Sequence, residues 1–204
     1  MKKLIVIVAS LLIAASAHAQ LGVVAGITSS KATIDAALSD VQNITQYHVG
    51  LTYKISLGGI FAIQPSLIYN VKGAKIAEFK AVGDISSFDY KNGYLELPVQ
   101  IQAGLNLGVA RIYAIAEPFL GYAITNSTQS SNGTKIDVKW NEVQNKLEYG
   151  VGVGAGIELI KHVQVSARYF WNLGNVESVA WASVTDAISN KAANGIVASV
   201  AILF

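Results

Sequence analysis

The sequence predicts an all-β fold, an eight-stranded antiparallel up-and-down β-barrel that crosses a membrane and is preceded by a cleaved signal peptide. Three observations predict it. Eight segments alternate apolar residues with other residues, and their apolar faces carry no charge while their opposite faces carry seven charges. The connectors between them are alternately short and long. Lipid-facing and lumen-facing residues alternate along the strands of a membrane barrel, and its turns are short at one rim only.

The first 19 residues have the pattern of a secretory signal peptide. Two lysines precede an apolar run over residues 4–15, and an A-x-A sequence follows at 17–19. The run is too short for a membrane-spanning helix, which needs about 20 apolar residues. We therefore expect residues 1–19 to be removed and residues 20–204 to form a single outer-membrane β-barrel domain.

Composition excludes several classes of protein. The chain has no cysteine, so it is neither a lipoprotein nor a disulfide scaffold. Of its 15 lysines and arginines, two belong to the signal, and the other 13 balance 13 acidic residues. This balance leaves no basic surface for nucleic acid. Hydrophobic residues make up 52% of the chain, yet they form no run after the signal long enough for a membrane helix.

The first four alternating segments cover residues 21–29, 46–57, 60–71 and 94–105. Segment 46–57 places two tyrosines, Val49, Leu51 and Ile55 opposite histidine, glycine, threonine and lysine. Segment 60–71 places aromatic and aliphatic residues opposite glutamine, serine and asparagine. Segment 94–105, YLELPVQIQAGL, is the clearest, with leucine, valine, isoleucine and alanine on one face. This period of two is the pattern of a strand whose faces meet different surroundings.

The last four segments cover residues 111–124, 147–159, 163–172 and 195–204. Segment 147–159 opposes its apolar residues with two glutamates and the glycines at 150, 152, 154 and 156, which leave room for bulky neighbours such as Tyr113 and Phe119. Segment 195–204 places five apolar residues, from Ile196 to Phe204, on one face. An unpaired apolar strand promotes aggregation, so we expect this strand to pair with the first and close the barrel.

The seven charges are candidate site residues. Because a charge facing lipid costs about 2–4 kcal/mol at the centre of a membrane, we expect them to face the lumen. Side chains fill the interior of an eight-stranded barrel, so we expect a structural network of paired charges. A small pore or proton path is the alternative. The seven are Lys54, Glu96, Arg111, Glu117, Glu148, Glu158 and Arg168.

The connectors predict how the barrel is oriented. The short ones lie near residue 58 and at 106–110 and 160–162, and the long ones cover about 30–45, 73–90, 126–143 and 174–193. Outer-membrane barrels have short periplasmic turns and long extracellular loops. We therefore expect both termini in the periplasm and the long loops outside the cell.

Aromatic residues on the apolar face predict the membrane boundaries. Phe61 and Phe204 lie toward the short-turn rim, and a second group lies toward the long-loop rim. Amphipathic rings concentrate at membrane–water interfaces, so the second group is an expected interface girdle. Its members are Tyr47, Tyr69, Tyr122, Tyr149, Tyr169 and Trp171.

Several stretches resemble a known family. The sequence GYLELPVQIQAGL contains an aromatic-L-E-L-P-V motif that resembles the PorT-like outer-membrane β-barrel family of Bacteroidetes, and LGVVAGIT, YGVGVGAGIE and the terminal aromatic are similar to it. The resemblance implies an outer-membrane barrel with a link to secretion. It also implies that Phe204 is part of a C-terminal signal for the barrel-assembly machinery.

The remaining candidate residues predict little chemistry. His48 has no partner at a spacing that specifies a catalytic triad, and His162 lies in a short turn, so we expect no enzyme. We also expect no metal and no cofactor, because no cysteine or histidine cluster is present. Trp181 lies in an apolar long loop, where it either contacts a partner or folds over the barrel mouth.

Three prolines conflict with the predicted strands. Pro65, Pro98 and Pro118 fall inside segments, although proline removes a ladder donor. The alternation keeps its phase across each of them, which does not indicate a one-residue bulge.

The favoured function is a non-enzymatic outer-membrane barrel that displays extracellular loops, with an envelope-structural or partner-docking role that includes secretion. Its expected partners are outer-membrane lipid, the assembly machinery and an envelope or secretion-complex protein. The alternative is a narrow channel for ions or small solutes. A soluble lipocalin-like barrel is a third reading, and the girdle and the uncharged face argue against it.

Overall fold

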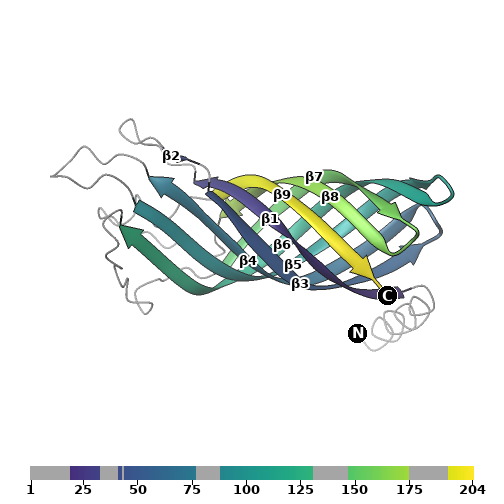
Figure 1. The fold of residues 1–204 in the computed structure, drawn as a ribbon, viewed down its shortest axis with the longest axis horizontal. Coiled ribbons are helices and arrows are strands. Elements are labelled where there is room, and N and C mark those ends of the chain that lie inside the picture. Colours follow the sequence, from purple (N-terminus) through teal and green to yellow (C-terminus); the bar gives the residue numbers. More distant parts are fainter. Residues whose placement is uncertain (1–18, 33–40, 43, 77–87, 131–146, 175–192) are drawn as a thin grey trace, which may run out of the picture.

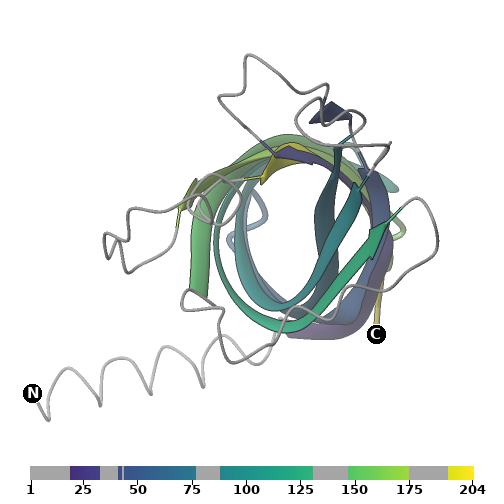
Figure 2. The same ribbon diagram turned by 90° about the vertical axis from the view of Figure 1, so that its left-hand side faces the viewer.

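The computed structural model describes residues 19–32, 41–42, 44–76, 88–130, 147–174 and 193–204. Within these ranges the chain forms an antiparallel barrel of eight strands. Figures 1 and 2 show the closed barrel from the side and from the end. Strands adjacent in the chain pair with each other, and the last pairs with the first. The predicted eight-stranded antiparallel barrel and its up-and-down order are confirmed. No helix in the part of the chain that the structure describes is long and apolar enough to span a bilayer.

The barrel strands run at least ten residues each, and a ninth strand is much shorter. This short strand, β2 (Val41–Gln42), pairs only with the end of β4. The barrel strands are β1 (Ala19–Ala32), β3 (Ile44–Leu57), β4 (Phe61–Ile76), β5 (Phe88–Asn106), β6 (Ala110–Ser130), β7 (Leu147–Leu159), β8 (Val163–Gly174) and β9 (Ala193–Leu203).

The two ends of the barrel differ, and we call them the short-turn end and the long-loop end. Residues 58–60, 107–109 and 160–162 connect the strands at the short-turn end. Gly58, Gly59 and Gly108 have positive φ angles there, which glycine adopts without strain. The C-terminus lies at this same end, because Gly22 of β1 pairs with Leu203 of β9.

Most barrel strands extend further at the long-loop end than the sequence predicted, and β4, β5 and β6 extend the furthest. Pairing between β4 and β5 continues to Ile76 and Phe88, and pairing between β5 and β6 continues to Phe88 and Ser130. The expected loops at 73–90 and 126–143 were therefore too long, as were those at 30–45 and 174–193, into which β1, β3 and β9 extend. The sequence of residues 125–130, TNSTQS, is polar at every position, so the apolar alternation ceases there while backbone pairing continues. Figure 1 shows the protruding ends of β4, β5 and β6.

The interior of the barrel is polar and its outer face is apolar. Among the described side chains, 21 buried residues are polar or charged and 12 are hydrophobic. Leucine, isoleucine, valine and aromatic side chains are exposed along every barrel strand. This distribution is the reverse of that in a soluble barrel, whose apolar face fills the core, and so the lipocalin-like reading is wrong.

The three prolines are accommodated by gaps in the ladder. Pro65 lies opposite Val99, and Pro98 lies opposite Phe119, so the prolines form a row across β4, β5 and β6. Backbone pairing is interrupted once at each proline: at Pro65 between β3 and β4, at Pro98 between β4 and β5, and at Pro118 between β5 and β6. The register is the same on both sides of each gap. The hydroxyl of Thr52 on β3 donates to the carbonyl of Pro65 at 3.4 Å, so a side chain supplies one contact in the gap.

Candidate functional site

All seven predicted charges lie buried in the lumen, and an eighth joins them. The eighth is Lys72, which is 3% exposed. The expected segment ended at Val71, one residue before it. The alternation of β4 was the signal that could have found it, because Asn70 and Lys72 share the buried face of the strand.

Near the long-loop end, Lys72 binds two carboxylates. Its ammonium nitrogen lies 2.7 Å from Glu96 Oε1 and 2.8 Å from Glu148 Oε1. Asn70 donates to both oxygens of Glu96 at 3.1 Å, and Asn172 donates to Glu148 Oε2 at 2.7 Å. We call these five residues the Lys72 cluster. With one cation and two carboxylates, its formal charge is −1.

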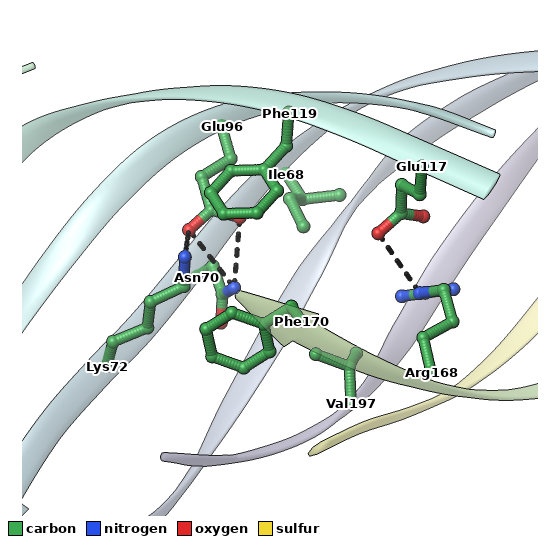
Figure 3. Close-up of a pocket in the computed structure, with 9 residues that line it drawn as sticks. All are labelled: Ile68, Asn70, Lys72, Glu96, Glu117, Phe119, Arg168, Phe170 and Val197. Atoms are coloured by element: carbon green, nitrogen blue, oxygen red, sulfur yellow. Dashed lines mark hydrogen bonds and ion pairs between the residues drawn. The ribbon is translucent and has the colours of Figure 1, made fainter. Parts of the chain in front are cut away.

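Aromatic rings surround the same ammonium group. Lys72 Nζ lies 4.5 Å from the ring centre of Phe119, 4.8 Å from that of Phe170 and 5.6 Å from that of Tyr94. These distances are within the range of cation–π attraction. The Phe119 and Phe170 rings also contact each other edge to face, at 6.1 Å. Figure 3 shows Lys72, Glu96 and the two phenylalanines around one space.

The middle of the lumen contains the pair Arg168 and Glu117. Arg168 Nε lies 3.1 Å from Glu117 Oε1. The two terminal nitrogens of Arg168 donate to Ser166 at 3.2 Å and to Ser199 at 3.0 Å. Glu117 Oε2 is buried and has no hydrogen-bond partner.

His48 connects the middle of the lumen to the Lys72 cluster. Thr28 donates its only hydroxyl hydrogen to Asn70 at 2.8 Å, so Nδ1 of His48 must donate to Thr28, at 3.1 Å. In the neutral ring, Nε2 then accepts from Ser199 at 2.9 Å. Sequence reasoning did not find this histidine–serine contact, because 151 residues separate the two. His48 is 1% and Ser199 5% exposed, so both side chains are buried.

Near the short-turn end, two cations share one carboxylate. Glu158 Oε2 lies 2.5 Å from Lys54 Nζ and 3.9 Å from Arg111. Gln164 also donates to Glu158, at 2.8 Å, and Arg111 donates to Gln102 at 2.9 Å. These five residues form the Lys54 cluster, whose formal charge is +1. The eight lumen charges therefore sum to zero.

One small cavity lies among these side chains. A cavity of about 10 Å³ lies between the Lys72 cluster and the Arg168–Glu117 pair, which is the space of about one water molecule. The described residues include no group of three or more histidine, cysteine, aspartate or glutamate side chains placed to bind a metal ion. The cavity is lined by Ile68, Asn70, Lys72, Glu96, Glu117, Phe119, Arg168, Phe170 and Val197 (Figure 3).

Residues 14–178 match the family described as outer membrane protein beta-barrel domain. The chain belongs to this family. No curated protein matches it in sequence. Solved structures to which this outer-membrane barrel is similar include Neisserial surface protein A (15% identity, 90% of this chain and 97% of that one, TM-score 0.47). A second is Ail, the attachment invasion locus protein of Yersinia pestis (10% identity, 92% of this chain and 99% of that one, TM-score 0.43). A third is OprG from Pseudomonas aeruginosa (10% identity, 91% of this chain and 94% of that one, TM-score 0.44).

The predicted girdle lies on the outer face of this outer-membrane barrel. All six aromatic residues are exposed or half-exposed. Tyr169 and Trp171 contact each other with ring centres 4.7 Å apart, and Tyr47 and Tyr69 lie 6.3 Å apart. From Tyr149 to Leu159, β7 rises about 33 Å along the strand, or about 25 Å along the barrel axis at a tilt of about 40°. This rise equals the height of the apolar band of such barrels.

Of the other predicted residues, Phe204 and His162 lie at the short-turn end of the barrel. Phe204 is 72% exposed, and its backbone N–H donates to the carbonyl of Leu21 at 2.7 Å. His162 Nδ1 hydrogen-bonds the carbonyl of Ile160 within the turn, at 2.6 Å. Trp181 and residues 1–18 of the expected signal peptide lie outside the described residues.

Proposed function

We propose that the protein is a non-conducting, non-enzymatic scaffold of the outer membrane whose long loops bind an envelope partner. The paired lumen charges carry this proposal. Each of the four cations and four glutamates lies near an opposite charge, and the cavity among them has the space of one water. Removing one partner of a buried ion pair costs about 3–5 kcal/mol. A path for ions through the lumen would require such pairs to separate, so the paired charges oppose conduction.

A narrow channel is the second candidate, because one observation favours it. Hydrogen bonds and ion pairs link Glu148 through Lys72, Glu96 and Asn70 to Thr28 and His48, and from there to Ser199, Arg168 and Glu117. Such a chain resembles a proton path. However, it passes through Arg168, and a guanidinium does not release its proton in proteins. The arginine therefore interrupts proton transfer, and the scaffold remains the better-supported function.

Conductance across a planar bilayer separates the two candidates. We expect the refolded protein to give the same current as the bare bilayer. The variant Glu117→Ala/Arg168→Ala removes the middle pair and so provides the matched control, in which we expect brief conductance steps. Reproducible steps from the unmodified protein would establish a channel and overturn the scaffold.

We also propose that the protein has no enzymatic activity, although His48 and Ser199 lie 2.9 Å apart. A serine nucleophile needs a base, a group that orients the base and access to substrate. Here the hydroxyl of Thr28, and not a carboxylate, contacts Nδ1, and both residues are buried. A serine-directed fluorophosphonate probe should leave the folded protein unlabelled, and labelling that Ser199→Ala abolishes would contradict this.

The long loops are proposed to face the cell exterior, with both termini in the periplasm. The protruding ends of β4, β5 and β6 support this, because they would place the polar ends of the barrel beyond the membrane. The chain contains no cysteine, so a maleimide reagent can label only a cysteine that is introduced. An impermeant maleimide should label Ser183→Cys, between β8 and β9, in intact cells. It should label Lys161→Cys, in a short turn, only after the outer membrane is opened, and the reverse pattern would invert the orientation.

The PorT-like resemblance supports an envelope or secretion-complex protein as the loop partner. Crosslinking in native membranes should yield a complex that survives in the Lys54→Ala variant but is lost when residues 175–192 are replaced by a short glycine–serine linker. Equal crosslinking by the loop-replaced protein would show that the partner does not need residues 175–192, and it would overturn the proposed binding through this loop.

A further inference from the structure

The ammonium group of Lys72 is bound as a ligand would be. Two carboxylates contact it at 2.7 and 2.8 Å, and the rings of Phe119 and Phe170 lie 4.5 and 4.8 Å away. Carboxylates neutralise an organic cation and ring faces attract it, and together they form the usual recognition site for an alkylammonium group. The five groups come from strands far apart in sequence, so the barrel wall assembles the site.

The carboxylates around Lys72 carry more negative charge than one lysine neutralises. Glu96 and Glu148 provide two negative charges against one positive charge. The Glu117 carboxylate also lines the adjoining cavity, but Arg168, which lines the same cavity and lies 3.1 Å from it, neutralises its charge. The cavity and the formal charge of −1 on the Lys72 cluster therefore remain beside the bound ammonium.

Lys54 provides a comparison within the same lumen. Its ammonium contacts a single carboxylate, Glu158, which also receives a hydrogen bond from Gln164 and the charge of Arg111. Among the described side chains, ring contacts to lysine are found at Lys72 and not at Lys54. Removal of Lys54 leaves a carboxylate that still has partners, whereas removal of Lys72 leaves two carboxylates facing each other.

We propose that Glu96, Glu148, Phe119 and Phe170 form a binding site for a primary alkylammonium ion, which Lys72 occupies as a tethered ligand. The site is a property of the lumen and is independent of what the loops bind. When the side chain beyond Cβ is removed, the site takes a free alkylammonium ion of the same length. For Lys72→Ala this ion is n-propylammonium.

The test is chemical rescue of the full-length Lys72→Ala variant in detergent micelles. We expect its thermal midpoint to fall by about 10 °C, because a buried ion pair has lost one partner. Added n-propylammonium should restore most of that loss in a saturable manner, and 1-propanol, which has the same shape without the charge, should not. If the variant does not refold alone, the refolding yield with and without n-propylammonium is the readout.

Three controls make the result specific. The wild type should not respond to n-propylammonium, because Lys72 fills the site, and Lys54→Ala should gain no more than it gains from an inorganic salt. In the Lys72→Ala background, Phe170→Leu should raise the half-saturating concentration about tenfold, since it removes one ring face. Equal rescue of Lys54→Ala, equal rescue by 1-propanol, or no rescue at all would each overturn the proposal.

Discussion

Among the described residues other than glycine, Ile160 and Lys161 have positive φ angles, which side chains disfavour. Their φ angles are +53° and +63° in the turn between β7 and β8. A β-branched residue rarely adopts positive φ, because its side chain crowds the backbone. The turn is nevertheless fixed from three sides, since Val109, Leu203 and Gln20 hydrogen-bond to residues 160–162. The barrel therefore holds a conformation that these two side chains disfavour.

Ile160→Asn should stabilise the protein. Asparagine tolerates the left-handed region, and two consecutive positive φ angles are those of a type I′ hairpin turn, in which asparagine is favoured. We expect a gain of about 0.5–1 kcal/mol in the free energy of unfolding, measured by urea titration in lipid vesicles. Ile160→Val, which keeps the β-branch, should change nothing. A loss of stability in the asparagine variant would show that the exposed isoleucine contributes through its contact with lipid.

The two partners of the Lys54–Glu158 pair should contribute unequally. Glu158 neutralises both Lys54 and Arg111, so Glu158→Gln leaves two buried cations uncompensated and should cost about 3–5 kcal/mol. Lys54→Met leaves Glu158 with Arg111 and Gln164, and should cost roughly 1–2 kcal/mol, within the range for hydrogen bonds to charged groups. Urea titration of both variants in the same vesicles measures the difference, and equal costs would contradict the shared-carboxylate geometry.

At the scale of the strand, the glycines of β7 predict a sharp contrast. A Cβ added at Gly154 would collide with the backbone carbonyl of Ala167 and lie 2.7 Å from the Cα of Arg168 on β8. A Cβ added at Gly152, two residues away on the same face, would meet only ordinary contacts of 3.5–3.6 Å. Gly154→Ala should therefore cost more than about 2 kcal/mol, in the range of overpacking. Gly152→Ala should be neutral or slightly stabilising, because alanine restricts the unfolded chain.

Thermal midpoints on heat-modifiability gels, where folded and unfolded barrels migrate differently, measure both glycine variants. Equal behaviour of the two would mean that β8 shifts to accept the added methyl group. That outcome would show the wall of the barrel to be more deformable than its continuous β7–β8 pairing over residues 150–159 indicates.

Strand positions were predictable wherever one face meets an apolar surrounding and the other does not. The predicted segment 147–159 coincides with β7, and each of the other barrel strands contains most of its predicted segment. The ends of β4, β5 and β6 were not predictable, because the alternate positions that are apolar in the rest of each strand are no longer apolar there. Lys72 was missed because the expected segment ended at Val71, although its position on β4 continues the alternation.

At the scale of the whole molecule, the sequence indicated which charges enter the lumen but not which ones pair. Successive side chains of a strand point to opposite faces, so a residue's position along the strand decides whether it faces inward. Pairing depends on which residues reach the same height, and this follows from strand tilt and stagger around the closed barrel. Lys54 and Glu158 are 104 residues apart, and alternation contains no information about such a contact. The tethered ammonium of Lys72 likewise required the three-dimensional arrangement of β4, β5, β6, β7 and β8.

The C-terminal strand closes the barrel, and its last two residues should have separable roles. Leu203 points inward and is fully buried, whereas Phe204 points outward and is 72% exposed. Leu203→Ala removes buried methyl groups and should cost about 2–5 kcal/mol of stability. Phe204→Ala removes almost no internal packing, and its backbone N–H still donates to Leu21, so its stability after refolding in detergent should change by less than about 1 kcal/mol.

In cells Phe204→Ala should be the more damaging of the two substitutions, because we infer that the assembly machinery binds the exposed terminal ring. The amount of heat-modifiable barrel in the outer-membrane fraction should fall severalfold for Phe204→Ala. For Leu203→Ala this amount should fall less, although Leu203→Ala is expected to be the less stable of the two variants in detergent. Phe204→Tyr, which keeps an aromatic ring, should assemble like the wild type. Normal assembly of Phe204→Ala would contradict this inference, and the terminal ring would then be an ordinary lipid-facing side chain that follows β9.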